Sequence, residues 1–169
     1  MSASLTPDTE SRLAPSELRY LVLAAQREGS REVNRRLADL KLTASQAEII
    51  LVLREFGPIT LKELGGLIVC EAGSPSRIVD TLVRRGLVVR TQDTVDRRAV
   101  SIELSESGRA LVSVLKEIDH AINAGALAQL AHSQLDGLVS SLRLYLADSE
   151  SHDVLERRFA AKRRPVSEF

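Results

Sequence analysis

Apolar residues follow two different periods along this chain, and the difference strongly limits the folds available to it. From residue 15 to residue 86, and again from 105 to 146, they recur at steps of three and four, the spacing of one helical face. Between residues 87 and 104 two short apolar stretches flank a polar one, and in the second, apolar and polar residues alternate, as in a half-buried strand. The sequence therefore predicts a mainly α-helical protein with one small β-hairpin.

Local start and stop signals refine this prediction. Capping boxes beginning at Thr43 and Thr60 predict two helix starts. A third helix is expected over residues 74–86, because Ser74 can act as N-cap, Pro75 suits the first helical position and Gly86 suits the C-terminal cap. Strands are expected at 87–89 and 100–104, around a polar tip at 91–98. This order is that of a winged helix-turn-helix.

Positive charge is concentrated in one stretch of a chain whose formal net charge is zero. Residues 74–98 contain six arginines and three aspartates, a local net charge of +3. Hydroxyl and guanidinium groups can reach base edges and phosphates in a major groove, so residues 74–86 are predicted to read DNA. The candidate DNA-binding residues of this helix are Ser74, Pro75, Ser76, Arg77, Thr81, Arg84 and Arg85.

The hairpin tip adds a second candidate contact. Arg97 and Arg98 lie there, and a thin hairpin can insert an arginine into a narrow minor groove. Asp96 beside them can cap its own turn. A charged run by itself is more often an ordinary solvated surface, but the hairpin context favours a DNA contact.

Three segments together resemble the MarR-type regulators. Residues 76–90 are similar to their recognition helix and first wing strand, Asp96-Arg97-Arg98-Ala99-Val100 to their wing motif, and residues 104–111 to their helix start after the wing. The resemblance implies a homodimer on a pseudo-palindromic operator, usually a repressor released by a small ligand or by cysteine oxidation. It also implies a structural ion pair between Asp96 and Arg98 and a minor-groove contact by the wing. One feature departs from the expected pattern: Glu71 and Asp80 place negative charge near the predicted DNA-binding face.

The expected organisation has four parts: a flexible arm (1–14), an N-terminal dimerisation helix (15–42), a DNA-binding winged helix-turn-helix (43–104), and C-terminal dimerisation helices with a tail (105–169). Apolar stripes in the first and last helices can be core, dimer interface or the lining of an effector pocket, and the first two are commoner. The last strong helix is predicted to begin near Ser133, with a charged helix following residue 153.

Other chemistry has weaker support. Cys70 is the single cysteine; it is either a redox sensor or a small buried residue, and the neighbouring Glu71 favours the second interpretation because a carboxylate raises a thiol pKa. His120, His132 and His152 lack metal-ligand spacing, so no metal or other cofactor is predicted. We find no phosphate loop or nucleophile motif, which argues against an enzyme.

The chain is expected to be soluble and cytoplasmic. No apolar run approaches the length of a membrane span, and the N-terminus lacks the features of a signal peptide. The alternative to a DNA-binding regulator is a winged-helix module that binds only other proteins, because a fold alone does not fix a function. Retention on heparin at moderate salt distinguishes the two.

We predict that Arg98→Ala severely weakens operator binding and leaves fold and dimer intact, because the substitution removes the wing's minor-groove cation. Electrophoretic mobility shifts measure the affinity. An unchanged affinity removes the wing from the mechanism.

Overall fold

The computed structural model describes residues 14–69, 74–92 and 100–160. Strands β1 (Ile59–Thr60), β2 (Val88–Gln92) and β3 (Val100–Leu104) form an antiparallel sheet in the order β1-β3-β2. The predicted class, mainly α with a small hairpin, is confirmed. The helices are α1 (Ala14–Leu37), the 3-10 turn η1 (Ala38–Leu40), α2 (Ala44–Phe56), α3 (Leu61–Gly65), α4 (Pro75–Arg84), α5 (Glu106–Gln129), α6 (His132–Tyr145) and α7 (Glu150–Phe159).

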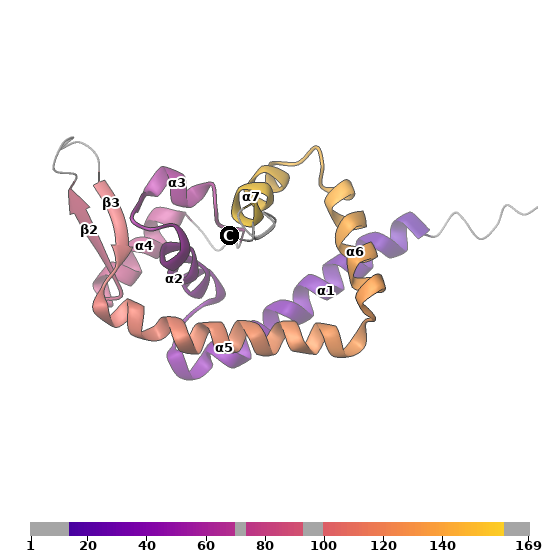
Figure 1. The fold of residues 1–169 in the computed structure, drawn as a ribbon, viewed down its shortest axis with the longest axis horizontal. Coiled ribbons are helices and arrows are strands. Elements are labelled where there is room, and N and C mark those ends of the chain that lie inside the picture. Colours follow the sequence, from indigo (N-terminus) through magenta and orange to yellow (C-terminus); the bar gives the residue numbers. More distant parts are fainter. Residues whose placement is uncertain (1–13, 70–73, 93–99, 161–169) are drawn as a thin grey trace, which may run out of the picture.

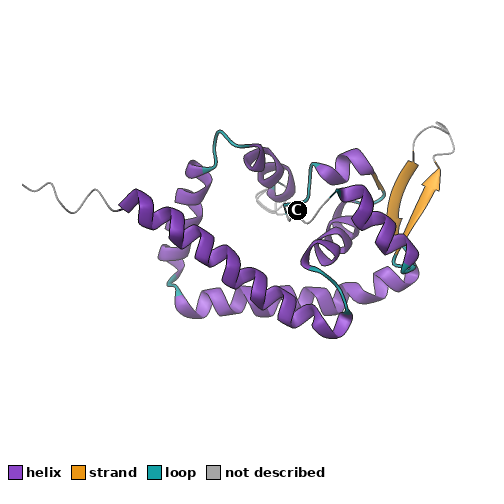
Figure 2. Cartoon of the chain, turned by 180° about the vertical axis from the view of Figure 1, so that it is seen from behind, coloured by secondary structure: helices purple, strands orange, loops and turns teal. Residues whose placement is uncertain are grey.

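The long helix α5 connects two ends of the molecule. Helices α2, α3 and α4 and the β2–β3 hairpin gather near its N-terminal end, whereas α6 leaves from its C-terminal end (Figure 1). Helix α1 packs against α5, and α7 returns from α6 toward α3, as the view from behind also shows (Figure 2). Within the described ranges, no helix combines the length and apolarity needed to cross a bilayer.

The core is built around α2. Ile49 and Ile50 are 0% exposed and Val52 is 1% exposed, and α2 packs against α1, α3, α4, α5 and β3. A segment that is apolar on nearly every side therefore forms the central helix of the fold. The other fully buried side chains come from the elements around α2, namely Leu37, Leu64, Leu82, Ile102, Leu115, Val79 and Val88.

Both predicted capping boxes are present. The N–H of Gln46 donates to Thr43 Oγ1 at 3.2 Å, and the N–H of Thr43 donates to Gln46 Oε1 at 3.1 Å. In the second box, Glu63 N–H donates to Thr60 Oγ1 at 3.2 Å, and Thr60 N–H donates to Glu63 Oε2 at 2.7 Å. These reciprocal bonds satisfy N–H groups that a helix start leaves unpaired, so they fix where α2 and α3 begin.

The end of α4 is joined to the start of α5. Gly86 has a φ of 69°, the left-handed conformation that glycine adopts at low cost. Ser105 Oγ donates to the Gly86 carbonyl at 2.6 Å and accepts the Gly108 N–H at 3.0 Å. A Cβ at Gly108 would lie 2.0 Å from the Leu87 carbonyl oxygen, so only glycine fits there.

Several predicted boundaries need correction. The first hairpin strand was expected at 87–89, but Leu87 donates its N–H to the Leu82 carbonyl at 2.9 Å and so completes the cap of α4. The strand instead continues through Gln92, because Arg90 and its neighbours pair by backbone with β3. Strand β1 was not predicted, since two residues carry no alternating pattern.

The C-terminal helices also differ from the prediction. Helix α6 begins at His132, before Ser133, because the Gln134 side chain accepts the N–H of Ala131 at 2.9 Å. Helix α7 begins at Glu150, three residues before the predicted charged helix. Gly29 does not interrupt α1.

We predict that Glu63→Gln flattens the dependence of stability on pH in the acid range. The Thr60 N–H, followed by the Thr60 hydroxyl, holds the pKa of the Glu63 carboxyl below its ordinary 4.5. A carboxyl whose pKa is lowered on folding stabilises the protein above its unfolded pKa, and that contribution disappears as the pH falls through the folded pKa. Glutamine keeps an acceptor for the cap but does not titrate there.

Urea unfolding between about pH 6 and pH 3 measures this effect. Glu55→Gln is the control, because Glu55 is also exposed and this substitution shows the effect of losing one negative charge alone. If the free energy of unfolding of Glu63→Gln falls with pH in the acid range as steeply as that of the wild-type protein, the prediction is contradicted.

Candidate nucleic-acid interface

Helix α4 has one buried face and one open face. Ile78, Val79 and Leu82 are at most 8% exposed and pack into the core. Arg77 and Arg84 are exposed, with half-buried Thr81 between them. Steps of four and three residues place these three side chains in one stripe. A rigidly supported helix therefore presents two guanidinium groups and a hydroxyl to solvent.

Hydrogen bonds along the helix organise this stripe. The Thr81 hydroxyl donates to the Arg77 carbonyl at 3.0 Å. Arg84 Nη2 donates to the same Thr81 Oγ1 at 3.0 Å. The guanidinium of Arg84 is thus held along the open face by a neighbour one turn away. This placement leaves its remaining N–H groups available to an anion.

The start of α4 also follows the predicted pattern. Ser74 occupies the N-cap position and Pro75 begins the helix, although the Ser74 side chain makes no capping hydrogen bond. Ser74 is exposed, and Pro75 and Ser76 are half-buried. The N-terminal turn of the helix therefore lies at the surface, on the side from which the stripe continues.

An ion pair links the wing to α4. Arg90 Nη2 on β2 lies 2.5 Å from Asp80 Oδ1 on α4. The two side chains are 41% and 46% exposed, so the pair adds little stability. It does offset the negative charge of Asp80, which the sequence places close to the proposed DNA face.

Arg85 differs from its neighbours on α4. Its Nη1 donates to the Lys41 carbonyl at 2.7 Å and to Gln46 Oε1 at 3.3 Å, and its Nη2 donates to the Leu40 carbonyl at 3.2 Å. The side chain therefore connects the end of α4 to the corner between η1 and α2. We leave Arg85 out of the interface proposed below, because these donors are directed into the protein.

A buried carboxylate that the sequence analysis did not single out lies behind this surface. Glu48 on α2 is 8% exposed, accepts the Val69 N–H at 2.9 Å and forms an ion pair with Arg158 of α7. The sequence gives one indication of this buried carboxylate, namely a single acidic residue within the apolar run of α2. Its partner is 110 residues away in the sequence, and no local pattern connects the two.

Comparison with known proteins identifies the domain that carries this surface. The MarR family model matches residues 42–100, which include α2, α3, α4, β1, β2 and the first residue of β3. Residues 42–100 therefore match the MarR family model, and we refer to them as the MarR-family domain.

A curated relative matches a longer part of the chain. The HTH-type transcriptional regulator TtmR of Methylorubrum extorquens is 31% identical over 127 residues, which are 74% of this chain and 65% of TtmR. The chain thus spans 65% of the length of this transcriptional regulator.

Two solved structures share the fold. A mutant MarR from E. coli complexed with operator DNA has a TM-score of 0.70 at 23% identity, covering 82% of this chain and 99% of that one. BpsR of Bordetella bronchiseptica, described for the regulation of its DNA binding by 6-hydroxynicotinic acid, has a TM-score of 0.68 at 24% identity, covering 76% and 98%. At these identities the likeness establishes the fold alone.

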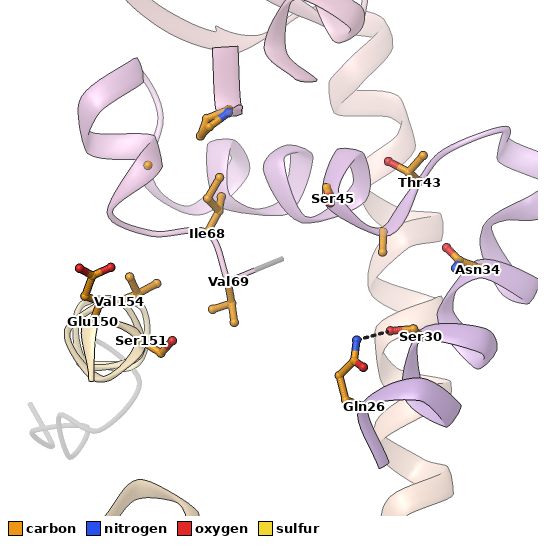
Figure 3. A pocket seen from close by; sticks show the side chains of 13 residues that line it. Gln26, Ser30, Asn34, Thr43, Ser45, Ile68, Val69, Glu150, Ser151 and Val154 are labelled. Carbon is orange, nitrogen blue, oxygen red and sulfur yellow. Dashed lines mark hydrogen bonds between the residues drawn. The ribbon is translucent and has the colours of Figure 1, made fainter. Parts of the chain in front are cut away.

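Two hollows lie beside the MarR-family domain. An open groove of about 1130 Å³ separates α1 from α7, with Ile68 and Val69 between them (Figure 3). Gln26 and Ser30 face it from α1 and are joined by a 3.2 Å hydrogen bond. A smaller cavity of about 320 Å³, more open to solvent than this groove, has a mostly apolar wall with Glu48 and Arg158 among its polar residues; its apolar side chains are Val33, Leu37, Ala44, Ala47, Leu51, Leu115, Ile118 and Ile122.

Several predicted residues lie outside the described part of the chain. They are Cys70 and Glu71 before α4, and Asp96, Arg97 and Arg98 at the hairpin tip. Of the histidines, His120 and His132 are exposed and His152 is half-buried. Within the described residues, no group of three or more His, Cys, Asp or Glu side chains gathers as metal ligands would.

We predict that Arg85→Met lowers the free energy of unfolding by about 1–2 kcal/mol, because the substitution removes three hydrogen bonds at the corner of the MarR-family domain. Urea denaturation measures the change. Arg84→Met on the open face is the matched control and is expected to shift it by less than about 0.5 kcal/mol. Equal effects of the two substitutions would show that the Arg85 contacts do not stabilise the corner.

Proposed function

We propose that this protein is a transcriptional regulator, a dimeric and sequence-specific DNA-binding repressor that a small ligand releases from its operator. One observation carries the DNA-binding part: the inner face of α4 is buried, and its opposite face presents Arg77, Thr81 and Arg84. A chain of zero net charge does not bind DNA by bulk attraction, so it needs such a focused surface.

In this proposal α4 enters the major groove. Residues near the N-terminus of a recognition helix contact base edges, which assigns Ser74, Ser76 and Arg77 to sequence reading. Arg84, the last residue of α4, is assigned to a backbone phosphate. Arg97 and Arg98 are assigned to the minor groove beside the wing, with Asp96 orienting Arg98. The E. coli MarR structure with operator DNA supports the use of this fold in this way.

Exposed apolar side chains on the outer helices support the dimer. Tyr20 on α1 is 62% exposed, and Leu144 and Tyr145 on α6 are 79% and 64% exposed. Leu18, Leu21 and Leu23 add to the surface on α1. Exposed apolar side chains of this size favour association where they lie together, and a two-fold dimer would present two copies of α4 to a pseudo-palindromic operator.

The 320 Å³ cavity supports release by a ligand. Its wall combines apolar side chains with a few polar groups, as small-molecule sites do. Helices α1 and α5 line it together with α2 of the MarR-family domain. A ligand seated there would contact both the outer helices and the DNA-reading part. BpsR, whose DNA binding responds to 6-hydroxynicotinic acid, supports this mode of control.

We predict different effects for the two arginines of the stripe. Arg77→Ala should cost about 1–3 kcal/mol of operator binding and relax specificity at one base pair, because a base contact is lost. Arg84→Ala should weaken binding to all sequences and reduce the slope of log K against log salt by about 1, because one phosphate contact is lost.

Selection of bound sequences from random DNA supplies the operator, and fluorescence anisotropy at several salt concentrations measures both quantities. Arg31→Ala on α1, whose ion pair with Glu28 is exposed, is the control. Wild-type binding with both arginines of α4 replaced would remove α4 from the interface. Failure of the wild-type protein to enrich any sequence or bind heparin would instead favour the protein-interaction module.

A further inference from the structure

The Glu48–Arg158 pair joins the last helix to the middle of the MarR-family domain. The Glu48 and Arg158 side chains are 8% and 20% exposed. A carboxylate so far removed from water requires a cation and hydrogen-bond donors around it. Arg158 supplies the cation, and the Val69 N–H donates to the same Glu48 oxygen at 2.9 Å.

These contacts converge on the segment that follows α3. Arg158 Nη1 also donates to the Leu67 carbonyl at 3.4 Å. The adjacent Arg157 lies over Gly66, where an added Cβ would come within 2.8 Å of Arg157 Nη1. The last turn of α7 thus covers residues 66–69, while α3 itself packs against α4.

A second ion pair continues the connection to α6. Arg143 of α6 and Glu156 of α7 are 2.5 Å apart, with side chains 29% and 38% exposed. Ion pairs and hydrogen bonds therefore run from α6 through α7 to Glu48 and the Val69 backbone. The helix proposed to form the dimer is joined in this way to the helix pair that presents the DNA-reading surface.

We propose that Arg158 and Glu48 are positioning residues for DNA recognition, and that α7 is the strap through which α6 sets the position of α3 and α4. This inference rests on the proposed function for its effect on DNA. The pair holds residues 66–69 against α2, which fixes the exit of α3 and, through the packing of α3 on α4, the angle of the recognition helix. If the contacts of the strap open, α4 fits the base pairs of its operator less well. The arginines that attract the DNA phosphates stay in place.

Three variants of the full-length protein test the pair: Arg158→Met, Glu48→Gln and the double variant. Arg158→Met should lower affinity for the selected operator by about tenfold, because it removes the cation beside a buried carboxylate. Glu48→Gln removes that charge and keeps an oxygen for the Val69 N–H. The double variant should therefore bind the operator more tightly than Arg158→Met alone.

A specificity measurement separates positioning from simple loss of structure. Affinity for random-sequence DNA should stay within about twofold of wild type in all three variants, since it depends on phosphate neutralisation. The matched controls are Arg31→Met and Glu28→Gln, which break an Arg–Glu pair whose side chains are both 66% exposed, and both should leave the specificity ratio unchanged. Equal loss of specific and random-sequence binding would overturn the proposal.

Amide hydrogen exchange tests the strap without DNA. In Arg158→Met the Val69 N–H should exchange several-fold faster while the amide of Leu115, buried in α5, keeps its protection. Unchanged exchange at Val69, or faster exchange at both positions, would show that the pair does not hold residues 66–69 specifically. If wild-type protein binds no DNA, the proposed function fails, and this measurement still decides whether the strap exists.

Discussion

The burial of α2 on nearly all its sides is the constraint on which the rest of this structure depends. Ile49, Ile50 and Val52 are almost fully removed from water, and five surrounding elements each bury an apolar face against this helix. Burial on this scale is the dominant favourable term in folding. It leaves α4 little freedom to rotate, because Val79 and Leu82 must stay in the core. The direction of the stripe formed by Arg77, Thr81 and Arg84 follows from that packing.

The arginines of this chain serve different purposes, which a count alone does not reveal. Arg77 and Arg84 face solvent, whereas Arg90 pairs with an aspartate. Arg85 and Arg158 make hydrogen bonds to backbone carbonyls at two corners of the domain. The planar guanidinium suits both tasks, since it donates in several directions at once. The local charge of +3 predicted a basic face, but only part of that charge lies on the open side of α4.

Features encoded within a few residues could be predicted from the sequence. The capping boxes at Thr43 and Thr60, the proline at the start of α4 and the alternation in β3 are all local, and each is present. Features that depend on distant segments could not. The inward direction of Arg85 depends on carbonyls some 45 residues away, and the partner of Glu48 lies near the other end of the chain. The candidate residues at the hairpin tip stay predictions.

The core around α2 and the connection from α6 through α7 are held by different kinds of interaction, and the two respond differently when the structure is disturbed. The core around α2 is apolar and close-packed, so small shifts within it are costly. The connection from α6 through α7 to residues 66–69 consists of a few ion pairs and hydrogen bonds. Such contacts are directional and can be replaced by water when they open, so they can break while the core stays intact. A disturbance of the outer helices therefore acts first on the contacts of α7 with residues 66–69, and it reaches α4 through the packing of α3 on α4.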